Sequence, residues 1–243
     1  MKRIQKGREC PELEGWRARN AAAPQNLVYG GGGFPNPEVL AALLREQGYL
    51  CGYTLKLIDE TSAHIEHVKP QTLCRREDDA LEAAQQVRER FDVAWGNMVA
   101  CFPAPGAPRP EYGAVKKDDW WPKNGLDGFV SPLVDGCEAR FRFELNGEIK
   151  VADDADVAAR ETIEKIRLND ERLQELRRRA FIEMGLHPKS ERPLSSPAKI
   201  NQLLAAWRHR DKNRKFKEFC VPLREVALRR LAMLQGRMAR VVE

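Results

Sequence analysis

A short segment of the chain combines the residue types that hydrolysis of a phosphate ester requires. His64 and His67, two of the four histidines in the sequence, flank Glu66 within residues 63–70. If this segment is a strand, His64 and Glu66 lie on one face and His67 lies on the other. A neutral imidazole, with an ordinary pKa of about 6.5, accepts a proton from water near pH 7, and a neighbouring carboxylate binds a hard divalent cation. The pattern predicts a metal-assisted hydrolytic site, although polar residues on an exposed strand edge would give the same pattern.

Two later segments supply further polar groups in an order that fits such a site. Asn97 lies in residues 95–101, and Lys116, Asp118 and Asp119 lie in the polar segment 116–119, which could begin a helix. The chain thus presents a hairpin, a Glu-His pair, an asparagine and a polar segment, in that order.

Turn residues and hydrophobic spacing predict the elements that must position these groups. Pro11 and Trp16 predict a short first helix, and Asn36 as N-cap with Pro37 predicts a helix that ends near Gly48. Residues rich in β-formers predict a hairpin or a short strand pair at 49–58 and a hairpin at 139–149 that turns at Asn146-Gly147. Helices are predicted at 78–90, from 157 to about 185, at 200–219 and at 223–241, with loops at 102–113 and 186–197.

Four consecutive glycines at residues 30–33 could cradle a phosphate group. No strand precedes them in a P-loop arrangement, and no Gly-Lys-Ser/Thr follows. The better interpretation is a flexible connector between the first two helices.

Composition places the chain among ordinary globular proteins. It has 243 residues, 42% hydrophobic and 32% charged, which excludes disordered, collagen-like and coiled-coil classes. No run approaches the roughly 18 apolar residues of a membrane span, and no signal-peptide pattern follows Met1. We therefore expect a cytoplasmic protein with no membrane partner.

The charge distribution indicates what kind of partner to expect, and the cysteine content indicates the state of the thiols. The net charge is +5, with +9 in residues 161–243 and −4 in residues 1–160, which suggests a polyanion or an acidic partner at the C-terminal part. A solvated helix face would give the same asymmetry. The six cysteines form no C-x-x-C pair, so we expect free, mostly buried thiols.

These residues, in this order, resemble the ββα-metal (HNH) nuclease module, in which a Glu/Asp-His pair ends a strand, an asparagine follows in a loop, and a helix supplies a further ligand. The sequence resembles more specifically the HNH family associated with retrons and the Septu anti-phage system (PtuB-like proteins). The matching stretches cover about residues 1 to 183, in family order, at residues 2–7, 11–13, 64–70, 95–98, 131–133, 137–141, 161–165, 168–169 and 172–173.

The resemblance implies an α+β fold, with a ββα-metal (HNH-like) nuclease core embedded in a mostly helical protein. It implies a nuclease domain at residues 1–185 and a basic helical extension at 186–243. His67 would be the general base, Glu66 a metal ligand or the residue that orients it, and Asn97 a brace for the loop behind His67. His64 would be a second catalytic or ligand residue.

The same resemblance suggests groups for the metal and the substrate. Lys69 and Lys116 would meet phosphate. The third metal position falls in the region of Asp118, with Asp119 nearly as good. The divalent cation would be Mg²⁺, with Mn²⁺ as an alternative.

One departure from the family pattern concerns a structural zinc that its members commonly hold with two cysteine pairs. Here Thr54 stands where the partner of Cys51 belongs, and Cys101 is followed by Glu111-Tyr112-Gly113 in place of a His-Cys-Gly run. Two thiolates are too few for a closed tetrahedral site. We therefore expect no structural zinc, and expect Cys51 and Cys101 to pack together with Tyr53 or Tyr112 in the vacated space.

The function that the resemblance implies is a metal-dependent endonuclease effector of a bacterial anti-phage defence complex. Its partners would be an ABC/SMC-like ATPase (PtuA-like), a nucleic-acid substrate, and a reverse transcriptase with its DNA–RNA product. The alternative is a catalytically degenerate HNH-like adaptor that binds the ATPase or nucleic acid. Lys and Arg placement does not distinguish DNA from RNA, because phosphate contacts carry no sequence information.

Overall fold

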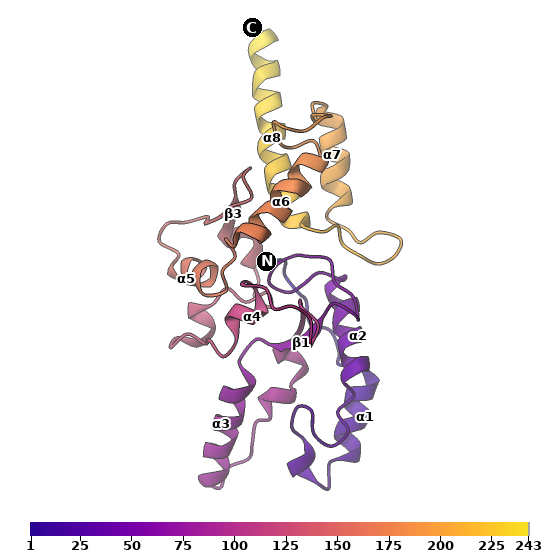
Figure 1. Ribbon diagram of the computed structural model, residues 1–243, viewed down its shortest axis with the longest axis vertical. Coiled ribbons are helices and arrows are strands. Elements are labelled where there is room, and N and C mark those ends of the chain that lie inside the picture. The colour runs from indigo at the N-terminus through magenta and orange to yellow at the C-terminus, as the bar shows by residue number, and fades with distance from the viewer. Residues whose placement is uncertain (243) are drawn as a thin grey trace.

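The chain folds into helices and two small antiparallel sheets, so its fold class is α+β, as predicted. Figure 1 shows the computed structural model, which describes residues 1–242 and side chains up to residue 236. The helices are α1 (Pro11–Arg19), α2 (Asn36–Gln47), α3 (Gln71–Ala83), α4 (Ala114–Lys117), α5 (Val157–Lys165), α6 (Glu171–Glu183), α7 (Pro197–Ala206) and α8 (Cys220–Val242). The strands are β1 (His64–His67), β2 (Met98–Cys101), β3 (Phe141–Phe143) and β4 (Ile149–Val151).

The elements are distributed along one long axis. Helices α1, α2 and α3 lie toward one end, and α6, α7 and α8 lie toward the other (Figure 1). Strand β1 lies between these two groups of helices, so the segment with the two histidines is near the middle of the molecule.

The first sheet carries the predicted chemical groups. β1 pairs antiparallel with β2, with His64 opposite Cys101 and His67 opposite Met98. Along β1, Ile65 and His67 are buried while His64 and Glu66 are half-buried, which confirms the predicted strand and the predicted alternation of faces. β2 is buried along its whole length.

The outer edge of β2 is closed by a side chain and a loop. Gln47, at the end of α2, donates from Nε2 to the carbonyl of Ala100 at 2.9 Å, and its Oε1 accepts from the Ala100 N–H at 2.6 Å. The N–H of Gly52 also donates to Ala100 at 3.1 Å. Because a buried backbone group without a partner is costly, this buried amide fixes α2 against the sheet.

Several predicted helices and turns are confirmed. α1 begins at Pro11 and buries Trp16, and α2 ends before Gly48, whose φ of 58° is the left-handed conformation that favours glycine at a helix end. α2 begins at Asn36 itself, one residue earlier than predicted. The second sheet, β3 with β4, is the hairpin predicted at 139–149, and Gly147 takes a φ of 90° in its turn.

The helix predicted at 78–90 is wrong in its position, because α3 spans Gln71–Ala83. Pro70 precedes its first residue. The Asp78 carboxylate accepts hydrogen bonds from the backbone N–H groups of Glu89 and Arg90 at 2.8 and 3.2 Å. The chain after α3 is therefore folded back along the helix instead of extending it.

Two further predictions need correction. Residues 49–58, predicted as a hairpin or a short strand pair, reverse direction with one isolated antiparallel bridge, between Leu50 and Leu57, and form no strands. The helix predicted at 200–219 is α7, which ends at Ala206, and the chain then returns to the N-terminal part, where the Phe216 N–H donates to Gly48 at 3.0 Å and that of Phe219 to Leu55 at 3.1 Å. These backbone bonds compete with continuation of the helix.

The glycine run is held in place and is not a free connector. Trp16 donates from Nε1 to the carbonyl of Gly32 at 3.0 Å, and Asn20 donates from Nδ2 to the same carbonyl at 3.3 Å. The loop at residues 20–34 is thereby fixed against α1.

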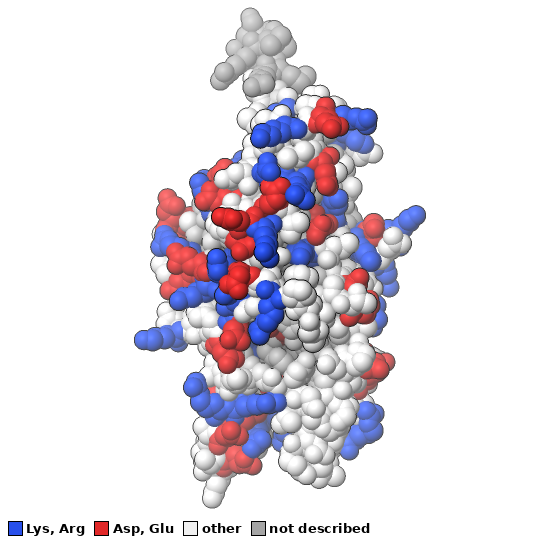
Figure 2. All heavy atoms as spheres, in the orientation of Figure 1, with Lys and Arg blue, Asp and Glu red and all other residues white. Residues whose placement is uncertain are grey.

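The excess of basic residues in the C-terminal part does not form a single patch on the face shown in Figure 2. Lys and Arg are interspersed there with Asp and Glu. Among residues 1–242, no helix is long and apolar enough to cross a membrane.

We predict that Gln47→Leu destabilises the protein by about 2 kcal/mol or more, because it leaves the buried Ala100 N–H and the Leu50 carbonyl without the hydrogen bonds of this amide. The measurement is urea unfolding at pH 7. Gln86→Leu, at an exposed glutamine, is the matched control and should change stability by less than about 0.5 kcal/mol. Equal effects of the two substitutions would contradict the role of Gln47.

Candidate functional site

A cavity of about 480 Å³ lies beside β1, and residues from both faces of the strand border it. The three predicted residues of the strand, His64, Glu66 and His67, all border it. The residues that complete its wall come from the loop before α2, the start of α3, the proline-rich loop and α4, and they include Tyr29, Gln71, Pro103, Arg109, Asp118 and Asp119. Five segments that are distant in sequence therefore meet at one hollow.

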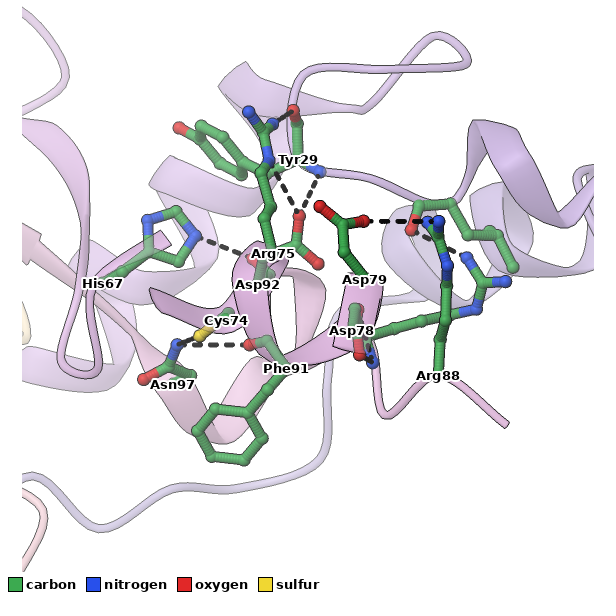
Figure 3. A network of polar contacts seen from close by, with 12 residues as sticks. Tyr29, His67, Cys74, Arg75, Asp78, Asp79, Arg88, Phe91, Asp92 and Asn97 are labelled. Atoms are coloured by element: carbon green, nitrogen blue, oxygen red, sulfur yellow. Dashed lines mark hydrogen bonds and ion pairs between the residues drawn. The ribbon is translucent and has the colours of Figure 1, made fainter. Parts of the chain in front are cut away.

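His67 is held at the edge of this cavity with one nitrogen engaged. Its Nε2 lies 2.7 Å from the carbonyl oxygen of Asp92 (Figure 3). A carbonyl only accepts, so Nε2 carries the proton and Nδ1 of the neutral ring is the lone-pair nitrogen. Among the described residues Nδ1 has no hydrogen-bond partner. Burial lowers the pKa of His67, which favours the neutral imidazole that can accept a proton.

Glu66 lies between two basic groups and a hydroxyl. Its Oε1 is 3.0 Å from Nζ of Lys117 and 3.5 Å from the hydroxyl of Tyr53, and its Oε2 is 3.5 Å from Nε2 of His64. Burial opposes ionisation, but Lys117 and His64 together hold the pKa of Glu66 below its usual value. The side chain is therefore a carboxylate at neutral pH.

His64 faces an acceptor with each of its nitrogens. Nδ1 lies 2.5 Å from the carbonyl oxygen of Pro103, and Nε2 faces Glu66. Burial acts to lower the pKa of His64, but the hydrogen bond and the charge of Glu66 raise it above its ordinary value. Two acceptors favour the form in which both nitrogens carry protons.

Asn97 holds the chain immediately after β1. Its Oδ1 accepts from the Lys69 N–H at 2.7 Å, and its Nδ2 donates to the Lys69 carbonyl at 3.0 Å and to the Phe91 carbonyl at 3.1 Å. The side chain is 2% exposed. One amide thus links the end of β1 to the segment that carries Asp92.

The two lysines expected to meet phosphate lie away from the cavity. Nζ of Lys69 pairs with Glu77 of α3 and lies 5.6 Å from the centre of the Phe91 ring. Nζ of Lys116 pairs with Glu111. Neither lysine borders the cavity, whereas Arg109 does.

Lys117 and Tyr29 are part of the site but were not predicted. Lys117 is 1% exposed, and besides Glu66 it donates to the carbonyl of His67 at 2.8 Å. The ring of Tyr29 meets that of His67 edge to face, with centroids 4.6 Å apart. The sequence gives no signal of this placement, because Lys117 follows a second lysine, Lys116, and Tyr29 precedes four glycines.

Three carboxylates border the cavity, and two of them could hold a divalent cation. Glu66 is one, and the exposed Asp118 at the end of α4 is the other, while Asp119 accepts a hydrogen bond from Thr72 at 2.8 Å. Within the part of the chain that the structure describes, no three His, Cys, Asp or Glu side chains gather as a metal site. Mg²⁺ typically uses one or two carboxylates together with water and substrate phosphates, which fits Glu66 with Asp118.

At the position where the HNH-like family holds its structural zinc, hydrogen bonds reach the thiol of Cys51. The Phe102 N–H donates to Sγ of Cys51 at 3.5 Å. Burial opposes ionisation, but hydrogen bonds from Cys101 and Thr54 lower the pKa of the Cys51 thiol to about 5. The ammonium of Lys56 lies 3.5 Å from the centre of the Phe102 ring and 3.4 Å from the hydroxyl of Tyr112. Hydrogen bonds from Thr54, Cys101 and Phe102 therefore reach the thiol of Cys51.

Comparisons with known proteins gave no match: neither the protein-family models nor the curated proteins contain one for this chain.

We predict that the protein purified without chelators carries well under one zinc per chain, because Thr54 and Tyr112 are not thiolates and the site has two cysteines, Cys51 and Cys101. Inductively coupled plasma mass spectrometry measures this directly. Stoichiometric zinc would overturn the prediction.

A second prediction compares two neighbouring lysines. Lys117→Met should destabilise the protein by about 3 kcal/mol, because it removes the nearer cation from the partly buried Glu66 carboxylate. Lys116→Met removes an ion pair to the exposed Glu111 and should cost less than about 1 kcal/mol. Urea unfolding at pH 7 measures both, and a difference below about 1 kcal/mol would contradict the importance of the Glu66–Lys117 pair.

Proposed function

We propose that this chain is a metal-dependent endonuclease of the HNH type, which cleaves phosphodiester bonds of nucleic acid in the cytoplasm. The observation that carries the proposal is the state of His67: Nε2 is tied to a carbonyl, and Nδ1 is left as an acceptor in a residue that borders the cavity with Glu66 and His64. A general base needs this combination of fixed orientation and a free lone pair.

In this proposal His67 accepts the proton of the attacking water at Nδ1. The bond from Nε2 to Asp92 orients the ring and stabilises the imidazolium that forms. Asn97 keeps the backbone after the base in place, since its amide holds both polar groups of Lys69. His64, with protons favoured on both nitrogens, places a positive group on the same face as Glu66.

Glu66 and Asp118 are the residues that would hold the divalent cation, Mg²⁺ or Mn²⁺. Such an ion, when bound, stabilises negative charge on the phosphate and on the leaving oxygen. Lys117 keeps Glu66 ionised and fixed, because it bridges the carboxylate and the carbonyl of His67.

The order of the elements supports an HNH-like core. Two antiparallel strands, β1 and β2, are followed by α4, and the Glu-His pair ends β1. The cavity lies where β1, the proline-rich loop and α4 meet. Helix α3 lies between the two strands in the chain, so the match to a ββα-metal module concerns the paired strands and the one-turn helix α4 that follows them.

We further propose that the protein acts as the effector of a bacterial anti-phage defence complex of the retron or Septu type. Its partners would be an ABC/SMC-like ATPase and a reverse transcriptase with its DNA–RNA product. Leu228 and Met233 of α8 are 45% and 55% exposed, and such apolar residues on a basic helix favour docking against a partner.

The second candidate function is an adaptor that binds the ATPase or nucleic acid without catalysis. One observation favours it: Lys117 already neutralises Glu66, which weakens the attraction of that carboxylate for a cation.

We predict that the full chain with Mg²⁺ or Mn²⁺, tested with and without its partner ATPase, cleaves plasmid DNA or RNA, and that His67→Ala slows cleavage by about a hundredfold or more because the general base is lost. His209→Ala, at an exposed histidine outside the cavity, is the matched control and should leave cleavage unchanged. Gel assays of the cut products measure both.

Equal cleavage by the wild type and His67→Ala would remove the nuclease proposal, as would no cleavage of any substrate. The adaptor function would then remain, and a binding assay with the partner ATPase would test it.

A further inference from the structure

We propose that Tyr29 contacts the substrate: its hydroxyl donates a hydrogen bond to a non-bridging oxygen of the phosphodiester on which His67 acts. This inference rests on the proposed nuclease function and adds a substrate-binding residue to it. Tyr29 comes from the loop before the glycine run, outside the stretches that resemble HNH nucleases.

The backbone of Tyr29 is fixed on both sides. Its N–H donates to Oδ2 of Asp92 at 3.0 Å, and its carbonyl accepts from Arg75 of α3 at 3.1 Å. Asp92 is the residue whose own carbonyl holds Nε2 of His67. One buried aspartate therefore positions both the general base and Tyr29, so that their relative placement is set by the fold.

The ring of Tyr29 is confined by two aromatic neighbours. It meets the His67 ring at an interplanar angle of 90°, and its centroid lies 4.9 Å from that of Phe34. In Figure 3 the hydroxyl points away from Asp92, and the His67 ring lies beside the tyrosine ring. The side chain is thus held as part of the cavity wall.

The hydroxyl is available as a donor. Among the described residues it has no hydrogen-bond partner, although tyrosine hydroxyls in partly buried positions usually find one. Burial and the negative charge of Glu66 raise the pKa of Tyr29, so the hydroxyl keeps its proton at neutral pH. The Tyr29 hydroxyl can therefore donate a hydrogen bond next to His67, and no protein group accepts it among the described residues. An oxygen of the substrate would be a suitable acceptor.

Phosphate oxygens are the acceptors that the cavity fits best. Arg109 and Gln71 border the same space as Tyr29 and add further N–H donors. A phosphodiester brings two non-bridging oxygens with one negative charge, and hydrogen bonds to charged acceptors are stronger than those between neutral groups.

The test is Tyr29→Phe, which keeps the ring packing and removes the hydroxyl. On an oligonucleotide that the wild type cleaves, kcat/KM should fall about ten- to hundredfold, while the midpoint of thermal unfolding stays unchanged. Tyr49→Phe, at a half-buried tyrosine outside the cavity, is the control and should cleave at the wild-type rate.

A phosphorothioate at the cleaved position separates contact from packing. Sulfur accepts hydrogen bonds poorly, so the penalty of Tyr29→Phe should shrink for at least one of the two thio isomers if the hydroxyl donates to that oxygen. An undiminished penalty on both isomers would overturn the inference, and so would wild-type cleavage by Tyr29→Phe.

The two proposals fail in different ways. A wild-type chain that cleaves nothing, or that cleaves equally well as His67→Ala, overturns the nuclease function and with it the role of Tyr29. A wild-type chain that needs His67 but tolerates Tyr29→Phe overturns the role of Tyr29 alone.

Discussion

The charge of Glu66 is the constraint on which the centre of the molecule depends. A carboxylate that is 14% exposed is stable only with a cation and donors beside it. Lys117 supplies the cation, and the same ammonium binds the carbonyl of His67. The end of α4 is thereby tied to the end of β1, and any arrangement that separates them removes the nearer of the two cations beside Glu66.

The predictable part of this arrangement is the part that local sequence determines. Alternation along residues 64–67 and the Asn146-Gly147 turn depend on neighbouring residues, and both predictions are confirmed. The position of α3 was mispredicted because the decisive group, the Asp78 carboxylate that binds the backbone at Glu89, acts between residues eleven positions apart. Hydrophobic periodicity contains no information about such a bond.

In the candidate site, too, some residues are placed by local sequence and others by long-range packing. His64, Glu66 and His67 border one cavity, and they lie within four residues of a single strand, although its alternation puts His67 on the other face. Lys117 and Tyr29 reach the site only through the packing of α4 and of the loop before α2. The side chains of Lys69 and Lys116 point elsewhere because Glu77 and Glu111 are nearer partners. The sequence therefore predicts the site residues that lie on one strand, but not those that reach the site from other elements.

Asp92 shows how strongly the base is linked to the rest of this end of the molecule. The residue is 1% exposed, its Oδ2 binds the loop at Tyr29, and Oδ1 has no partner in the described part of the chain. An unpaired buried oxygen lowers stability, so the aspartate is held there by its other contacts, which include the bond from His67 and the nearby guanidinium of Arg75 at 3.8 Å. Because these contacts come from β1, α3 and the loop before α2, the orientation of His67 is a property of the assembled fold and not of its strand alone.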